Sequence, residues 1–157
     1  MQKITPFLWF NDNAEEAVKL YTSIFKNSKI KTVTHYTEAG PGPKGSVMTI
    51  CFELDGSEFL ALNGGPDFKF TEAISFVVNT NSQEELDNLW NKLIADGGQP
   101  SHCGWLKDKF GLSWQIVPSR LGEWLSGDGR KVKKMQEVLF KMDKLDIATL
   151  EKAYEEA

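Results

Sequence analysis

The chain has 157 residues, of which 41% are hydrophobic and 11% aromatic, enough to bury one core or two small ones. It carries 18 basic and 22 acidic residues, a formal net charge of −4 at pH 7, so we expect no basic face for nucleic acid. No run approaches the roughly 18 apolar residues that span a bilayer, and the N-terminus lacks the apolar stretch of a signal peptide. Two cysteines are too few for a disulfide framework. We therefore expect a reduced, cytoplasmic protein with neither a membrane nor a nucleic-acid partner.

The first 66 residues predict a strand, a helix and three further strands. Asn13 followed by Glu16 is typical of a capping box, in which the Asn oxygen accepts from the helix start and the Glu reaches back. Asp55 and Gly56 predict a tight turn before the last strand. Apolar periodicity places the strands at 4–10, 30–37, 47–54 and 58–62, and the helix at 14–25.

The same order recurs in residues 70–118. Ser82 and Glu85 form a second capping box, and the helix that follows ends at residues 96–98. The two helix starts superimpose at an offset of 69 residues, and so do the strands before them. Further strands are expected at 101–107 and 112–117, joined by a turn with Gly111 at its positive-φ position. A repeat of this length predicts two copies of one supersecondary unit.

Residues 119–157 predict a helical tail, whose third helix is capped by Asp146. We expect one domain, 1–157, made of the modules 1–66 and 70–118 and this tail. The apolar face of the tail must cover either its own sheet or a second subunit. Since a module edge is also unpaired, we expect a homodimer. The apolar residues of the tail that need a partner surface are Trp124, Met135, Leu139 and Met142.

Two motifs suggest chemistry that their surroundings do not support. Residues 40–45 fit the letters of a dinucleotide fingerprint, but a strand follows them instead of a helix, and their prolines lack N–H donors. A mobile connecting loop is expected there. His102 and Cys103 suggest a metal or an activated thiolate, but neighbouring side chains on a strand face opposite ways, and the chain has only two His and two Cys. Neither site is expected.

The most distinctive stretch, residues 104–117, leaves a choice open. Gln115 is a neutral polar residue in an otherwise apolar strand, and a buried amide needs hydrogen-bond partners. A ligand in a concave sheet could supply one. A hairpin with its aromatic residues in the core explains Trp105 equally well.

These residues carry a resemblance to a known superfamily. Two strand–helix–three-strand units, with an Asp-x-Phe-Gly turn at residues 108–111, resemble the vicinal oxygen chelate proteins: glyoxalases, bleomycin resistance proteins and extradiol dioxygenases. Residues 4–10, 103–118 and 141–147 resemble the PhnB-like branch, often labelled 3-demethylubiquinone-9 3-methyltransferase. The resemblance implies an α+β fold of paired βαβββ modules with a C-terminal helical tail.

The resemblance also implies where a metal would bind. In the metalloenzymes of the superfamily, four His or Glu ligands from the first and last strand of each module chelate a divalent ion. The corresponding positions hold Thr5, Leu60 or Ala61, Ala73 and Gln115. Only Thr5 and Gln115 offer an oxygen, and such ligands suit hard cations only within a larger set. We therefore expect no metal and no other cofactor.

We expect a small-molecule-binding protein whose ligand is aromatic or weakly polar. Alternate residues of the module strands would face a cleft, as an apolar wall with neutral hydrogen-bonding groups and no fixed charge. Counting along the strands from Thr5 and Gln115, the positions that the resemblance gives, the expected ligand-binding residues are Thr5, Phe7, Trp9, Cys103, Trp105, Ser113 and Gln115. The opposite parity would leave Phe7 and Trp9 against the helices.

Other functions stay open at this point. One is an enzyme that uses Gln115, Asp108 or Cys103. The resemblance also implies a methyltransferase, or a metal-dependent lyase or dioxygenase. The chain lacks the Gly-rich strand–turn–helix cradle that a nucleotide-derived cofactor needs. The last alternative is a dimerisation module without a ligand.

Overall fold

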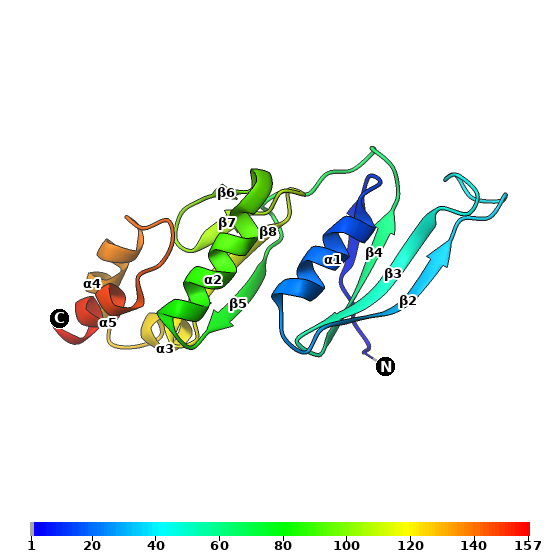
Figure 1. Ribbon diagram of the computed structural model, residues 1–157. Coiled ribbons are helices and arrows are strands. Elements are labelled where there is room, and N and C mark those ends of the chain that lie inside the picture. Colours follow the sequence, from blue (N-terminus) through cyan, green and yellow to red (C-terminus); the bar gives the residue numbers. More distant parts are fainter. Residues whose placement is uncertain (1) are drawn as a thin grey trace. The chain divides into compact units, whose positions relative to one another are not determined.

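The computed structural model describes residues 2–157 and contains two four-stranded sheets with helices (Figure 1). The chain divides into two compact units, and the boundary falls between Phe70 and Thr71. None of the helices in residues 2–157 is long and apolar enough to cross a membrane.

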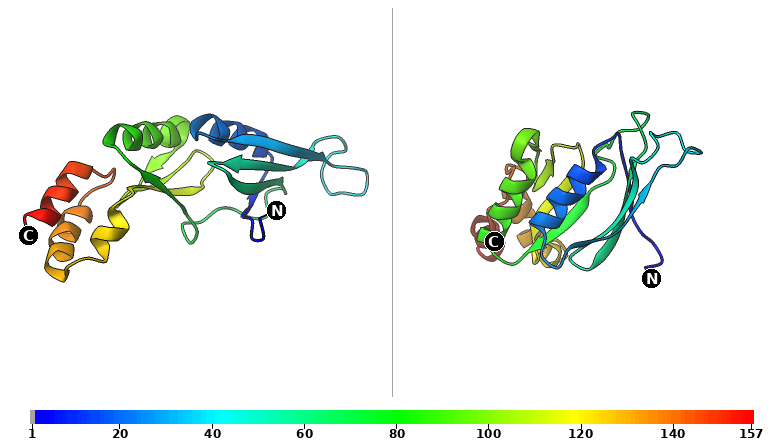
Figure 2. Two further views of the ribbon diagram at one scale, coloured as in Figure 1. Left: turned by 90° about the horizontal axis from the view of Figure 1, so that it is seen from below. Right: turned by 45° about the vertical axis from the view of Figure 1, so that its right-hand side comes forward.

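The first unit has the order strand, helix and three strands that the sequence predicts. Its elements are β1 (Phe7–Phe10), α1 (Ala14–Ile24), β2 (Lys29–His35), β3 (Val47–Leu54) and β4 (Ser57–Asn63). The sheet order is β1-β4-β3-β2, in which β1 runs parallel to β4 and the other pairs are antiparallel. Alternate residues such as Leu8, Ile50 and Phe52 are buried under α1. The opposite face of this sheet carries no helix of the unit (Figure 2).

The second unit repeats this arrangement. Its elements are β5 (Phe76–Thr80), α2 (Gln83–Ile94), the 3₁₀ turn η1 (Ala95–Gly97), β6 (Gln99–Pro100), β7 (Trp105–Lys107) and β8 (Ser113–Pro118). The sheet order is β5-β8-β7-β6, again with the first and last strand parallel. Both α2 and β5 begin 69 residues after α1 and β1. The predicted α+β fold of paired βαβββ modules is therefore confirmed.

The two predicted capping boxes have different outcomes. At α2, the Ser82 side chain accepts a hydrogen bond from Glu85 N at 3.1 Å, and Glu85 Oε2 accepts one from Asn81 N at 2.9 Å. At α1, Asn13 makes no side-chain cap. Instead, Asn63 at the end of β4 places its Oδ1 atom 2.9 Å from Ala14 N. The predicted Asn13 cap is wrong because a distant residue fills its role.

The tail forms α3 (Leu121–Leu125), α4 (Gly129–Leu139) and α5 (Ile147–Glu155), which belong to the second unit (Figure 2). Most of its apolar residues are covered there: Trp124, Met135 and Leu139 are at most 5% exposed, whereas Leu125 and Phe140 are 42% and 64% exposed. Backbone bonds from Cys103 N to Met142 O and from Gly104 N to Asp143 O, both 2.8 Å, attach the segment before α5. The tail therefore packs mainly on its own unit, and the homodimer stays a prediction.

Candidate functional site

The helix-free face of the first sheet, the face away from α1, carries Phe7 and Trp9. They alternate with the buried Leu8 and Phe10, and Phe7 is 53% exposed. Trp9 is fixed: its Nε1 donates to Gly65 O at 2.9 Å, and its ring meets Phe68 edge to face at 4.9 Å. The strand register places Leu60 and Leu62 of β4 beside them. This is the face that the sequence predicts for Phe7 and Trp9.

The same face also carries charge. Glu53 and Glu58 lie opposite each other on β3 and β4, and Lys31 Nζ is 3.4 Å from the first and 2.8 Å from the second. The hydrogen bond from Lys31 lowers the pKa of Glu58. Because Phe7 is paired with Leu60, Thr5 lies in the row of Glu58. The predicted wall without fixed charge is therefore wrong for this unit.

The face of the second sheet away from α2 holds three of the other predicted residues, Trp105, Ser113 and Gln115. Gln115 of β8 lies between Trp105 of β7 and Val77 of β5, which is 54% exposed. Gln115 Nε2 donates to Ser75 Oγ at 2.9 Å. Within residues 2–157, its Oε1 atom has no donor. A half-buried amide oxygen between two apolar side chains can accept a hydrogen bond from a ligand.

The next row of that face is more polar. Ser113 is 1% exposed, and within the described part of the chain its Oγ atom has no hydrogen-bond partner. Lys107, opposite Ser113 on β7, forms an ion pair with Glu72. Fixed charge therefore borders this face as well, which the sequence analysis did not anticipate.

Cys103 does not lie on a strand. The predicted strand 101–107 is interrupted: β6 ends at Pro100 and β7 begins at Trp105. Cys103 occupies the turn between them with φ 59°, and its Sγ lies 3.8 Å from Leu139 O in the tail. The structure therefore places Cys103 against the tail and not beside Trp105 on the sheet face.

The enzymatic alternatives lose two of their three candidates. Asp108 is 2% exposed, and its carboxylate accepts hydrogen bonds from its own turn and from Trp114 Nε1. It is therefore a structural residue of the turn. Burial raises the pKa of the Cys103 thiol, as does the nearby Asp143, so this thiol is not activated. His102 is bound to Asp143 at 2.7 Å and not to the cysteine.

The donor set does not fit the metal that the superfamily implies. Two of the four corresponding positions, Thr5 and Gln115, offer a hydroxyl or an amide, and the other two, Leu60 or Ala61 and Ala73, offer no ligand atom. Glu58, the carboxylate beside Thr5, is already paired with Lys31. No group of three or more His, Cys, Asp or Glu in residues 2–157 could hold a metal ion. We therefore derive no chemical step through a metal.

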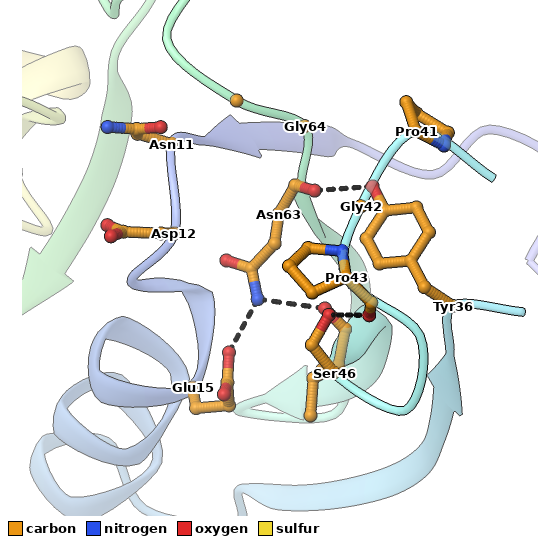
Figure 3. A pocket seen from close by; sticks show the side chains of 12 residues that line it. Asn11, Asp12, Glu15, Tyr36, Pro41, Gly42, Pro43, Ser46, Asn63 and Gly64 are labelled. Carbon is orange, nitrogen blue, oxygen red and sulfur yellow. Dashed lines mark hydrogen bonds between the residues drawn. The ribbon is translucent and has the colours of Figure 1, made fainter. Parts of the chain in front are cut away.

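A pocket that the sequence analysis missed lies in the first unit (Figure 3). Its volume is about 350 Å³, and it lies between the loop that joins β2 to β3 and the turn that joins β1 to α1. The loop is the Gly/Pro segment 39–46, which folds around Tyr36. The alternation of Gly and Pro next to a tyrosine was the available signal for such packing.

Comparison with known proteins relates both modules to one family. A family model described as 3-demethylubiquinone-9 3-methyltransferase matches residues 2–117, so the helical tail, residues 119–157, lies outside the match. A search of curated proteins found no match.

Solved structures are similar in fold. A PhnB protein from Bacillus cereus, named as a 3-demethylubiquinone-9 3-methyltransferase, is 40% identical with a TM-score of 0.68, over 74% of this chain and 99% of that chain. Protein PA1353 from Pseudomonas aeruginosa is 21% identical with a TM-score of 0.61, over 75% and 98%. The fosfomycin resistance protein FosX from Listeria monocytogenes is 16% identical with a TM-score of 0.56, over 80% and 98%. The last two show likeness of fold alone.

Proposed function

The chain belongs to the 3-demethylubiquinone-9 3-methyltransferase family, the PhnB-like branch of the vicinal oxygen chelate superfamily, and we propose that it binds a small, weakly polar aromatic molecule without a metal. The observation that carries this proposal is the environment of Gln115. Its free amide oxygen is flanked by Trp105 and Val77 on the sheet face away from α2. An apolar surface with one fixed hydrogen-bond acceptor suits a flat ligand that carries a hydroxyl or an N–H group.

A methyl-transfer reaction has less support than binding. The Gly-rich segment 39–46 joins β2 to β3, so no helix begins after it to hold a nucleotide-derived cofactor. Neither Asp108 nor Cys103 is free to act as an acid, base or nucleophile. The family name alone therefore does not support a reaction for this chain.

We also propose that the protein works as a homodimer in the cytoplasm. The partly exposed Phe7 leaves apolar surface on the helix-free face of the first sheet, which a second copy would cover. Two cysteines without a disulfide suit a reducing compartment. A monomeric mass by light scattering at micromolar concentration would exclude the dimer.

The test begins with protein purified without chelators. Native mass spectrometry detects a co-purified organic ligand, and elemental analysis of the same sample measures metals. We expect an organic ligand and no stoichiometric zinc, nickel, iron or manganese. A stoichiometric transition metal would refute metal-free binding, and a sample with neither would favour the dimerisation module.

Two variants then locate the ligand. Trp105→Leu should weaken its binding by about 1–3 kcal/mol through lost aromatic contact, and Gln115→Leu by about 0.5–1.5 kcal/mol through one lost hydrogen bond. Gln136→Leu makes the same chemical change on α4, away from the sheet, and should bind like the parent. Equal affinity of all four proteins would show that Trp105 and Gln115 are only structural.

A further inference from the structure

The pocket of the first unit is lined by none of the seven predicted ligand-binding residues and is unexplained by the proposed function. Its volume of about 350 Å³ lies in the range of small-molecule sites. The β1–α1 turn forms one wall and the β2–β3 loop the other, with Asn63 between them (Figure 3). The twelve lining residues are Asn11, Asp12, Glu15, Tyr36, Pro41, Gly42, Pro43, Ser46, Val47, Asn63, Gly64 and Gly65.

The loop wall is held in place by Tyr36. This side chain is 7% exposed, and its hydroxyl donates to Asn63 O at 2.5 Å. Gly40 and Gly42 lie against its ring: a Cβ at Gly42 would overlap the Tyr36 ring, so only glycine fits there. The pyrrolidine rings of Pro41 and Pro43 restrict φ on either side of Gly42. The Tyr36 ring and the two prolines therefore restrict the conformation of the loop that forms this wall.

The opposite wall is fixed through Asn63. Its Oδ1 accepts from Ala14 N, while its Nδ2 donates to Glu15 Oε1 at 2.6 Å and to Val47 O at 3.1 Å. Figure 3 shows the Glu15 side chain directed toward Asn63. Asn63 thus holds the first turn of α1, the start of β3 and the Glu15 carboxylate at fixed positions around the pocket.

The charge of the lining favours one class of ligand. Asp12 and Glu15 are acidic, and no lining residue is basic. Lys44, in the same loop, is paired with Glu38 at 2.6 Å and does not line the pocket. The start of α1 contributes about half a positive charge, which two carboxylates outweigh. The prolines offer no N–H donors to an anion.

We propose that this pocket binds a small organic cation, a primary ammonium group on a short apolar chain. The ammonium group binds on the side of Glu15 and Asp12, and the chain packs against Pro41 and Pro43. All residues of this site lie within the first unit, so a test of amine binding here is independent of a test of ligand binding at Gln115.

The test follows backbone amide signals by NMR while n-butylammonium chloride is added to the full-length protein. The amides of Gly42, Gly64 and Gly65 report on the pocket. Neutral 1-butanol and inorganic phosphate are titrated separately, and each titration is repeated at higher salt. We expect saturable shifts at the three glycines with the amine alone, weaker at higher salt because exposed charge pairs are screened.

Charge removal gives a second readout. Glu15→Gln with Asp12→Asn should weaken amine binding by about tenfold, as expected from losing charge-assisted hydrogen bonds. The matched control is Glu16→Gln, an exposed residue of the same helix turn outside the lining, which should bind like the parent. Three results would overturn the proposal. They are equal shifts with 1-butanol, tighter binding of phosphate than of the amine, and amine affinity that changes neither with salt nor with the paired substitution.

Discussion

The Asp108 carboxylate accepts hydrogen bonds from its own turn and from the strand β8 that follows it. Oδ1 accepts from Phe110 N at 2.9 Å and from Leu112 N at 3.1 Å, while Oδ2 accepts from the indole Nε1 of Trp114 at 2.9 Å. Asp108→Asn changes one of these acceptors into an NH₂ group. We expect the amide oxygen to keep the two backbone donors, so that the NH₂ group faces the indole N–H.

The expected cost follows from that clash of donors. Trp114 is 2% exposed, so its indole N–H would lose its partner out of reach of water. A hydrogen bond to a charged group contributes about 1.5–3 kcal/mol, and a buried donor left without a partner costs about 1–3 kcal/mol. We therefore expect Asp108→Asn to lower the free energy of unfolding by about 2–4 kcal/mol. In a Trp114→Phe background, which has no indole N–H, it should cost at least 1 kcal/mol less.

Urea denaturation followed by tryptophan fluorescence measures this cycle. Of the five tryptophans only Trp9 lies in the first unit, so the change in fluorescence mainly reports the unfolding of the second unit. The exposed Asp96→Asn is the matched control and should change the free energy by less than about 0.5 kcal/mol. An equal cost of Asp108→Asn in both backgrounds would refute the indole contact, and unchanged stability with lost ligand binding would show a functional aspartate.

Two further predictions concern ionisable groups. A hydrogen bond from Gln83 and the nearby Lys144 lower the pKa of Asp87, so its stabilising effect is present at neutral pH and disappears as the pH falls through the lowered pKa. Asp87→Asn should therefore reduce stability by a few tenths of a kcal/mol at neutral pH and have no effect in acid; a constant difference in urea denaturation across this range would contradict the assignment. Burial raises the pKa of both Cys51 and Cys103, so iodoacetamide should alkylate them about tenfold more slowly in the native protein than in urea at neutral pH. Native alkylation as fast as in urea would show an activated thiol.

Local patterns in the sequence determined the elements and their repetition. The Ser82 capping box depends on atoms within four residues of one another, and it forms as predicted. The turn at Asp55 and Gly56, with φ of 48° and 79°, and Gly111, with φ of 87°, also follow from local conformational preference. The period of two along β1 put Phe7 and Trp9 on one face together, but it did not decide which face lies away from α1.

The parts that the sequence did not determine depend on residues far apart in the chain. Asn63 replaces Asn13 as the cap of α1 because the end of β4 lies beside the helix start. Lys31 meets Glu58 because the pairing of β2 with β3 shifts between Ile30 and Thr32, and alternation along one strand does not reveal such a bulge.

The position of the tail and the formation of the pocket also depend on contacts between residues far apart in the chain. The backbone amides of Cys103 and Gly104 hold the tail on its own unit, although the apolar pattern of the tail was equally compatible with a second subunit. The segment 39–46 forms a pocket wall because it folds around Tyr36, whose hydroxyl donates a hydrogen bond to the backbone oxygen of Asn63 on β4. Helix caps, turns and strand alternation arise from interactions between near neighbours in the sequence. Charge pairs, the tail's partner and the pocket arise from contacts between segments that only the folded chain brings together.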